Sequence, residues 1–168
     1  SLDRILLKDI TDKIQSLAYP QGASHEEIVS HTGLILSYNE THEMANWTAH
    51  MILPRIETGN LSRSNDFRTD PQISTGSSEE GDYFMKYQLE DGSYDYDGYG
   101  YDRGHLVPSA DYRWSKTAMS ATYFYSNMSP QKPEFNRECW ASLESFLRDY
   151  VIFQQASLIV YTGPVLHD

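Results

Sequence analysis

The chain has 168 residues, of which 39% are hydrophobic and 22% are charged. This length suits one compact domain with its own hydrophobic core. No run of about 18 apolar residues exists, which excludes a membrane-spanning helix. The single cysteine, Cys139, excludes an internal disulfide framework and a cysteine-rich zinc site. No charged-then-apolar leader opens the sequence, so we expect no signal peptide in this chain.

The chain is acidic, with 13 basic and 24 acidic residues, a formal net charge of -11 and a pI near 4.8. Taken alone, this balance argues against tight nucleic-acid binding, because neutralising phosphates requires lysine and arginine. The charge is unevenly distributed. Residues 1–100 carry seven basic and seventeen acidic side chains, whereas residues 101–168 carry six and seven. The acidic excess therefore lies upstream of the segment that holds the candidate chemistry.

The first half of the chain predicts one helix and a β-hairpin. Apolar residues recur at three- and four-residue steps over residues 3–17, which is typical of an amphipathic helix. Two strand candidates, residues 34–38 and 47–53, are joined by the polar segment 39–45. We regard residues 1–20 as a helical extension of a single domain spanning residues 1–168.

Residues 76–98 differ in composition from the rest of the chain. They are rich in glycine, serine, tyrosine and acidic residues. We expect a long, exposed and flexible loop there.

The last third predicts a strand–strand–helix unit followed by one more strand. The strand candidates are residues 99–105 and 122–126, and a helical stretch covers residues 134–150. Residues 158–162 read as a last buried strand, stopped by glycine and proline. A strand–strand–helix unit can present one side chain from each element to a common point.

The tetrapeptide Asp102-Arg103-Gly104-His105 is the first candidate for chemistry. On an extended segment, Arg103 and His105 lie on the same face. Arginine offers a fixed positive fork for phosphate, and histidine can accept a proton near neutral pH. Gly104 would let a substrate approach the backbone. The alternative is an Asp–Arg pair beside a structural histidine.

Two further groups supply amide and carboxylate side chains. Asn127 precedes a proline turn and, by itself, is typical of turn chemistry. Asn136, Trp140 and Glu144 follow each other at four-residue steps on one helix stripe. Asn136 and Glu144 are roughly 12 Å apart along the axis, so Asn136 would bind an ion directly and Glu144 through water. The alternatives are a helix N-cap for Asn136 and a surface pair with Arg148 for Glu144.

In this order, the motifs resemble those of the DNA/RNA non-specific endonucleases, the ββα-metal nucleases related to endonuclease G. The resemblance covers about residues 34–168. The matching residues are Asp66-Phe67-Arg68, Asp102-Arg103-Gly104-His105, Ser126-Asn127, Pro130-Gln131, Asn136, Trp140, Leu143-Glu144 and Tyr161-Thr162-Gly163-Pro164.

The resemblance implies a mechanism and a role for each residue. His105 would be the general base that deprotonates the attacking water, and Arg103 would bind the scissile phosphate. Asn136 would be the direct protein ligand of Mg²⁺, with Mn²⁺ and Ca²⁺ as alternatives, and Glu144 would hold a metal-bound water. Asn127 would orient His105 or its surroundings. DNA and RNA would be the substrates, cut to 5′-phosphate products.

The resemblance also implies an α+β fold with a central antiparallel sheet, flanking helices and a ββα-metal finger. Some family members have an arginine at the position of Asn65, and Arg63 or Arg68 would supply that charge here. The family's catalytic domain usually continues beyond Gly163, so we expect the chain to be truncated at its C-terminus. Common export within the family implies a secreted or periplasmic protein.

Two questions stay open at this point. A nuclease-like module that binds nucleic acid or protein without turnover is the alternative to an enzyme, because of the net charge and the expected truncation. A homodimer or an inhibitor partner is also left open. We expect His25, His31, His42 and His50 to be surface or structural residues, since their spacing matches no zinc motif.

Overall fold

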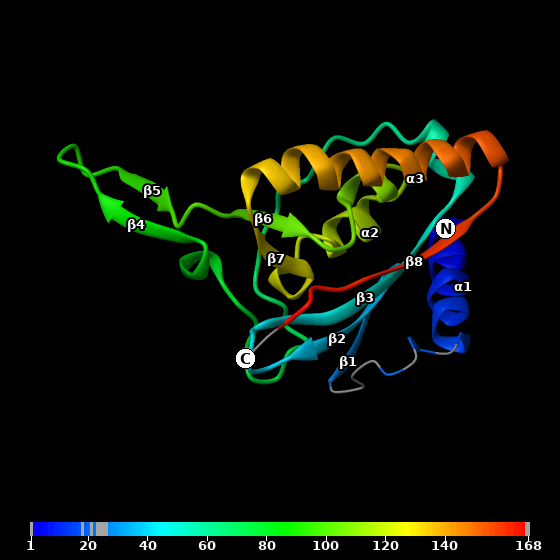
Figure 1. Ribbon diagram of the computed structural model, residues 1–168, viewed down its shortest axis with the longest axis horizontal. Coiled ribbons are helices and arrows are strands. Elements are labelled where there is room, and N and C mark those ends of the chain that lie inside the picture. The colour runs from blue at the N-terminus through cyan, green and yellow to red at the C-terminus, as the bar shows by residue number, and fades with distance from the viewer. Residues whose placement is uncertain (1, 18, 21, 23–26, 167–168) are drawn as a thin grey trace.

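The computed structural model describes residues 2–17, 19–20, 22 and 27–166 (Figure 1). Its helices and strands are α1 (Leu2–Ser16), β1 (Ile28–His31), β2 (Leu34–Asn39), β3 (Met44–Ile52), β4 (Phe84–Gln88), β5 (Tyr94–Gly98), β6 (Asp102–His105), α2 (Lys116–Ala121), β7 (Met128–Gln131), α3 (Ala141–Gln154) and β8 (Leu158–Thr162). None of the helices in these residues is long and apolar enough to cross a membrane.

An antiparallel sheet forms the centre of the fold. Within the described part of the chain, its order is β1-β2-β3-β8. The predicted hairpin is the β2–β3 pair, and the expected α+β class with an antiparallel sheet is confirmed. No strand was predicted at β1, because this stretch of the sequence is largely polar. β8 was predicted as a buried strand but is a half-buried strand at the sheet edge.

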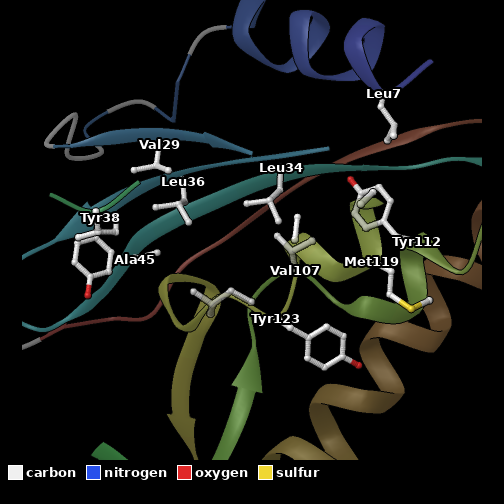
Figure 2. Close-up of a cluster of buried hydrophobic side chains, with 14 residues drawn as sticks. Leu7, Val29, Leu34, Leu36, Tyr38, Ala45, Val107, Tyr112, Met119 and Tyr123 are labelled. Atoms are coloured by element: carbon white, nitrogen blue, oxygen red, sulfur yellow. The ribbon is translucent and has the colours of Figure 1, made fainter. Parts of the chain in front are cut away.

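The two faces of the sheet carry different partners because side chains alternate along β2. Ile35 packs with Ile10 and Ile14 of α1. Leu34 and Leu36 belong to a second cluster with apolar residues from the segments after β6 and from α2. Figure 2 shows the labelled members of that cluster, Leu7, Val29, Leu34, Leu36, Tyr38, Ala45, Val107, Tyr112, Met119 and Tyr123. The sheet is thus covered on both faces, and the candidate site is built on the α2 side.

Residues 76–98 were expected to be a flexible loop, and this was wrong in part. β4 and β5 pair in register from Phe84–Gly98 to Gln88–Tyr94. The resulting hairpin projects away from the body of the protein (Figure 1). The segment was expected to be exposed, and even its large side chains Tyr87 and Leu89 are exposed. Hydrogen bonds between the two backbones hold β4 and β5 together, and amino-acid composition does not indicate such pairing.

A second correction concerns residues 122–126, which were predicted to be a strand. They follow α2 and enter a 3₁₀ turn at Tyr125–Asn127, with one isolated bridge between Arg68 and Phe124. The true partner of β6 is β7. Tyr123 and Tyr125 are buried, so their aromatic character reflects core packing and not strand formation.

Two of the four histidines singled out in the sequence are buried and paired with carboxylates. His31 Nε2 lies 2.7 Å from Asp70 Oδ2, and His50 Nε2 lies 2.7 Å from Asp111 Oδ2. This agrees with a structural role. His25 lies outside the described residues.

Candidate active site

A pocket of about 340 Å³ brings together most of the predicted site residues. Its lining includes Arg103 and His105 from β6, and Asn136 and Glu144 from the helix that follows β7. Arg63, from the loop before β4, closes another side. These side chains come from positions between 63 and 144 in the sequence, and the fold brings them to one pocket.

The β6–β7 ribbon holds Arg103 and His105 on the same face. Gly104 pairs with Ser129 in the antiparallel register. A Cβ atom at Gly104 would lie 2.1 Å from the Gln131 side chain, so only glycine fits without movement. The expectation that Gly104 admits substrate is corrected: the Gln131 side chain occupies that approach.

His105 is enclosed by aromatic rings. Its imidazole meets Tyr123 edge-on at 4.8 Å between centroids and Phe67 at 5.9 Å. Its Nε2 is buried and has no hydrogen-bond partner among the described residues. Burial, reinforced by the positive charges of Arg63 and Arg103, lowers the pKa of His105 to about 3. The imidazole is therefore neutral at physiological pH, as a proton acceptor must be.

Asn127 does not touch the imidazole in any described contact. Its Nδ2 donates to the carbonyl oxygens of Val107 at 3.0 Å and Thr122 at 2.8 Å, and its Oδ1 accepts from the Val107 N–H at 2.9 Å. Its own carbonyl oxygen accepts from the Leu106 N–H. The side chain is fully buried. Of the two expected roles, the structure supports bracing the chain that follows His105 and not orienting the ring.

Asn136 lies inside a helix that opens at Pro133 and is π-helical over Phe135–Trp140. The N-cap alternative is therefore excluded. Its Nδ2 donates to Asp102 Oδ2 at 2.9 Å. Arg137 donates to both oxygens of the same carboxylate, at 2.9 and 2.7 Å. The hydrogen bond and charge of Arg137 hold the pKa of Asp102 below its usual value, despite partial burial.

Glu144 faces the same pocket one helical turn before Arg148. Burial raises the pKa of Glu144 to about 7, although Arg148 opposes that rise. Arg148 Nη1 lies 4.0 Å from the Glu144 carboxylate and donates to Asp111 Oδ1 at 3.0 Å. The expected pair of Glu144 with Arg148 thus exists, but Asp111 shares the arginine. Through Asp111, this network reaches His50 in the central sheet.

The three candidate phosphate-binding arginines differ in their surroundings. The Arg103 guanidinium lies 3.6 Å from the Phe67 ring centroid and 4.8 Å from that of Phe84. Arg63 is exposed at the pocket rim. Arg68 does not line this pocket, and its assignment to substrate binding stays a prediction. It donates to Asp66 at 2.8 Å, stacks on a ring, and lines a separate pocket of about 520 Å³.

Sequence reasoning missed the residues that support the pocket. Asp102 belongs to the tetrapeptide that contains His105, but no supporting role was predicted for it. No role was predicted for Arg137 either. Asp111 and His50 gave no local signal, because the carboxylate meets partners 37 and 61 positions away. Such contacts arise only when the chain folds.

A model of the DNA/RNA non-specific endonuclease family matches residues 12–168. The chain belongs to this family. It is 32% identical over 154 residues to a protein named nuclease from Nostoc sp., covering 88% of this chain and 52% of that protein. It is 31% identical to mitochondrial endonuclease G of Bos taurus, covering 83% of this chain and 42% of that protein.

The fold is also similar to that of a solved family member. A chain in the crystal structure of an EndoG/EndoGI complex superposes with a TM-score of 0.68 and 26% identity, covering 88% of this chain and 60% of that chain. The chain thus spans about half the length of the curated relatives described here. Since the endonuclease family includes proteins named as mitochondrial, export of this chain stays a prediction.

Proposed function

We propose that the protein is a metal-dependent, sequence-non-specific endonuclease that hydrolyses phosphodiester bonds of DNA and RNA to 5′-phosphate products. One observation carries the proposal: a neutral imidazole, arginines, an amide and a carboxylate from separate segments line one pocket. Membership in the endonuclease family supports the same activity.

His105 is assigned the role of general base. Its neutral imidazole takes a proton from the attacking water as the water oxygen bonds to phosphorus. The bond between phosphorus and the 3′ oxygen breaks, and its electron pair stays on the 3′ oxygen, which takes a proton from solvent and leaves as a 3′-hydroxyl. The phosphate therefore remains on the 5′ end of the product. Burial weakens His105 as a base in the free protein. A bound phosphate would counter the charges of Arg63 and Arg103 and so raise the basicity of the ring.

Arg103 and Arg63 are assigned to the substrate phosphate. Arg103 rests on Phe67, so its planar fork is held in place before substrate arrives. Arg63 supplies the charge that other family members place at the position of Asn65, and both residues line the pocket. We therefore assign this charge to Arg63 and not to Arg68, which does not line the pocket.

The donors in the pocket fit Mg²⁺. Asn136 offers an amide oxygen that accepts no described hydrogen bond, while its nitrogen is engaged by Asp102. Glu144 offers a second oxygen donor in the same pocket. Mg²⁺ prefers oxygen ligands and retains several waters, so one direct ligand and one through water suit it. When bound, the ion would stabilise negative charge on the phosphate.

The test is a plasmid-nicking assay with Mg²⁺ and with EDTA, combined with a gel-shift measurement of plasmid binding. We expect nicking with Mg²⁺ and none with EDTA. The alternative, a binding module without turnover, predicts a gel shift without nicking under either condition. Ligation of the cut ends without prior phosphorylation checks for 5′-phosphates. Because the structural neighbour was solved in an inhibition complex, an inhibitor protein is a proposed partner, and a homodimer stays a prediction.

A further inference from the structure

The Asp102 carboxylate is a shared acceptor for two consecutive residues of the π-helical segment. Its Oδ2 accepts from Asn136 Nδ2 and from Arg137 Nε, both at 2.9 Å. Its Oδ1 accepts from Arg137 Nη2 at 2.7 Å. A π-helical turn holds more residues than an α-helical one, so consecutive side chains are separated by a smaller angle. This geometry brings both neighbours to one carboxylate.

The contact decides which end of the Asn136 amide faces the pocket. An asparagine amide has a donor end and an acceptor end of nearly the same shape. An ionised carboxylate accepts hydrogen bonds only, so Asp102 can engage Nδ2 but not Oδ1. Rotating the amide by half a turn would set two oxygen acceptors against each other. Oδ1 is therefore left as the end available to a cation.

Arg137 holds the carboxylate that makes this selection. A bidentate arginine–carboxylate pair fixes both distance and plane. The Asp102 side chain is 19% exposed and that of Arg137 is 69% exposed. Without Arg137, the carboxylate would be free to rotate and to exchange its Asn136 contact for water.

We propose that Arg137 is a positioning residue for the metal site: its bidentate pair with Asp102 locks the Asn136 amide with Oδ1 toward the cation. This inference rests on the proposed function, because it deepens the role given there to Asn136. It assigns Arg137 a role other than binding phosphate, although Arg137 also lines the pocket.

Because Arg137 is positively charged, the direction in which its removal changes Mg²⁺ affinity tests the proposal. An arginine near a cation site repels the cation, so removing its charge alone would tighten Mg²⁺ binding. Removing a residue that orients a ligand weakens binding, commonly by tenfold or more. A phosphate-binding role predicts a third result, in which the KM for nucleic acid rises and Mg²⁺ affinity does not weaken.

The experiment is a titration of the ¹⁵N-labelled protein with Mg²⁺ alone, followed by the side-chain amide resonances of Asn136. The variants are Arg137→Ala, Arg137→Lys and Asn136→Ala, with Arg113→Ala as the control. Arg113 is an exposed arginine that bonds one main-chain oxygen outside this pocket. For Asn136→Ala, main-chain resonances near the pocket report the binding. Thermal unfolding of each variant checks that the fold is intact.

We expect Arg137→Ala to weaken Mg²⁺ binding roughly tenfold and to make the Asn136 amide protons exchange faster with water in the metal-free protein. Arg137→Lys should recover only part of both effects, since lysine keeps the charge without the bidentate geometry. Arg113→Ala should match the wild type. Unchanged or tighter Mg²⁺ binding in Arg137→Ala, with Asn136→Ala weakened, overturns the positioning role alone. Unchanged binding in Asn136→Ala overturns the ligand role of Asn136, and this inference with it.

Discussion

The indole Nε1 of Trp140 donates a hydrogen bond to the main-chain carbonyl oxygen of His105 at 3.2 Å. This contact joins the helix that carries Asn136 to the strand that carries the proposed base. Trp140 is also stacked on Phe135, with 5.8 Å between ring centroids. The sequence placed Trp140 on the stripe between Asn136 and Glu144, and the hydrogen bond explains how that helix is fixed against β6.

Trp140→Phe should lower the hydrolysis rate more than it lowers stability. The substitution keeps an aromatic ring next to Phe135 but removes the donor to His105, at a cost of about 1 kcal/mol in the free energy of unfolding. A shift in the helix would misplace Asn136 relative to His105, and small misplacements reduce rates strongly. The measurements are kcat on plasmid DNA and urea unfolding. A variant with the wild-type kcat would show that this contact does not set the geometry.

His105 and Glu144 should titrate in the reverse of their usual order. With a pKa near 3, His105 stays neutral as the pH falls from 8 to 5, whereas Glu144, with a pKa near 7, takes up a proton over that interval. Carbon-13 and nitrogen-15 NMR of the metal-free protein follows each group directly. An imidazole that titrates near its ordinary value of about 6.5 would contradict the buried, neutral base.

The same shift of His105 affects stability. The pKa of His105 is lower in the folded than in the unfolded chain. Between about pH 6.5 and pH 3 the unfolded chain therefore binds more protons than the folded one. The contribution of His105 to stability therefore declines as the pH falls through that interval.

Asp70→Asn should destabilise the protein more at pH 7 than at pH 3. Burial opposes ionisation of Asp70, but hydrogen bonds from His31, Ser126 and the Gln72 N–H hold the pKa of its carboxyl below the usual value. Stability from a lowered carboxyl pKa is present above the unfolded value of about 3.9 and is lost as the pH falls toward the folded value.

Urea unfolding at both pH values checks this prediction. At pH 7 we expect a loss of about 1–3 kcal/mol, and at pH 3 a smaller one. Asp12→Asn serves as the control, because Asp12 forms an exposed pair with Lys8 on α1. Equal losses at the two pH values for Asp70→Asn would remove its ionised carboxylate from the account of stability.

The regular parts of the fold could be predicted from local pattern. The helix at the N-terminus, the β2–β3 hairpin and β8 show clear apolar periodicity or compact apolar runs. The β4–β5 hairpin could not be predicted, since its glycine-rich and acidic composition matches that of loops. The strand predicted at residues 122–126 was wrong for the opposite reason. Its aromatic residues are typical of a strand, but here they are buried tyrosines of the core outside any strand.

The site was predictable where the motif residues themselves line the pocket, as His105, Arg103, Asn136 and Glu144 do. Prediction was incomplete where a role depends on which neighbour a side chain meets. Arg68 donates to Asp66 and does not line the pocket, and the sequence indicated neither fact. The partner of Asn136 lies 34 positions earlier in the chain, and sequence spacing carries no information about that contact.

Single-turnover hydrolysis of a defined DNA duplex, and of its RNA counterpart, tests the central claim most directly. The variants are His105→Ala and Asn136→Ala, with His42→Ala, a histidine outside the pocket, as the control. We predict that wild type and His42→Ala cut both substrates with Mg²⁺ at many positions. His105→Ala should be slower by on the order of 10² to 10⁴, with thermal unfolding close to wild type, and Asn136→Ala should also be slower. Near-wild-type hydrolysis by His105→Ala would contradict the assignment of this pocket as the active site.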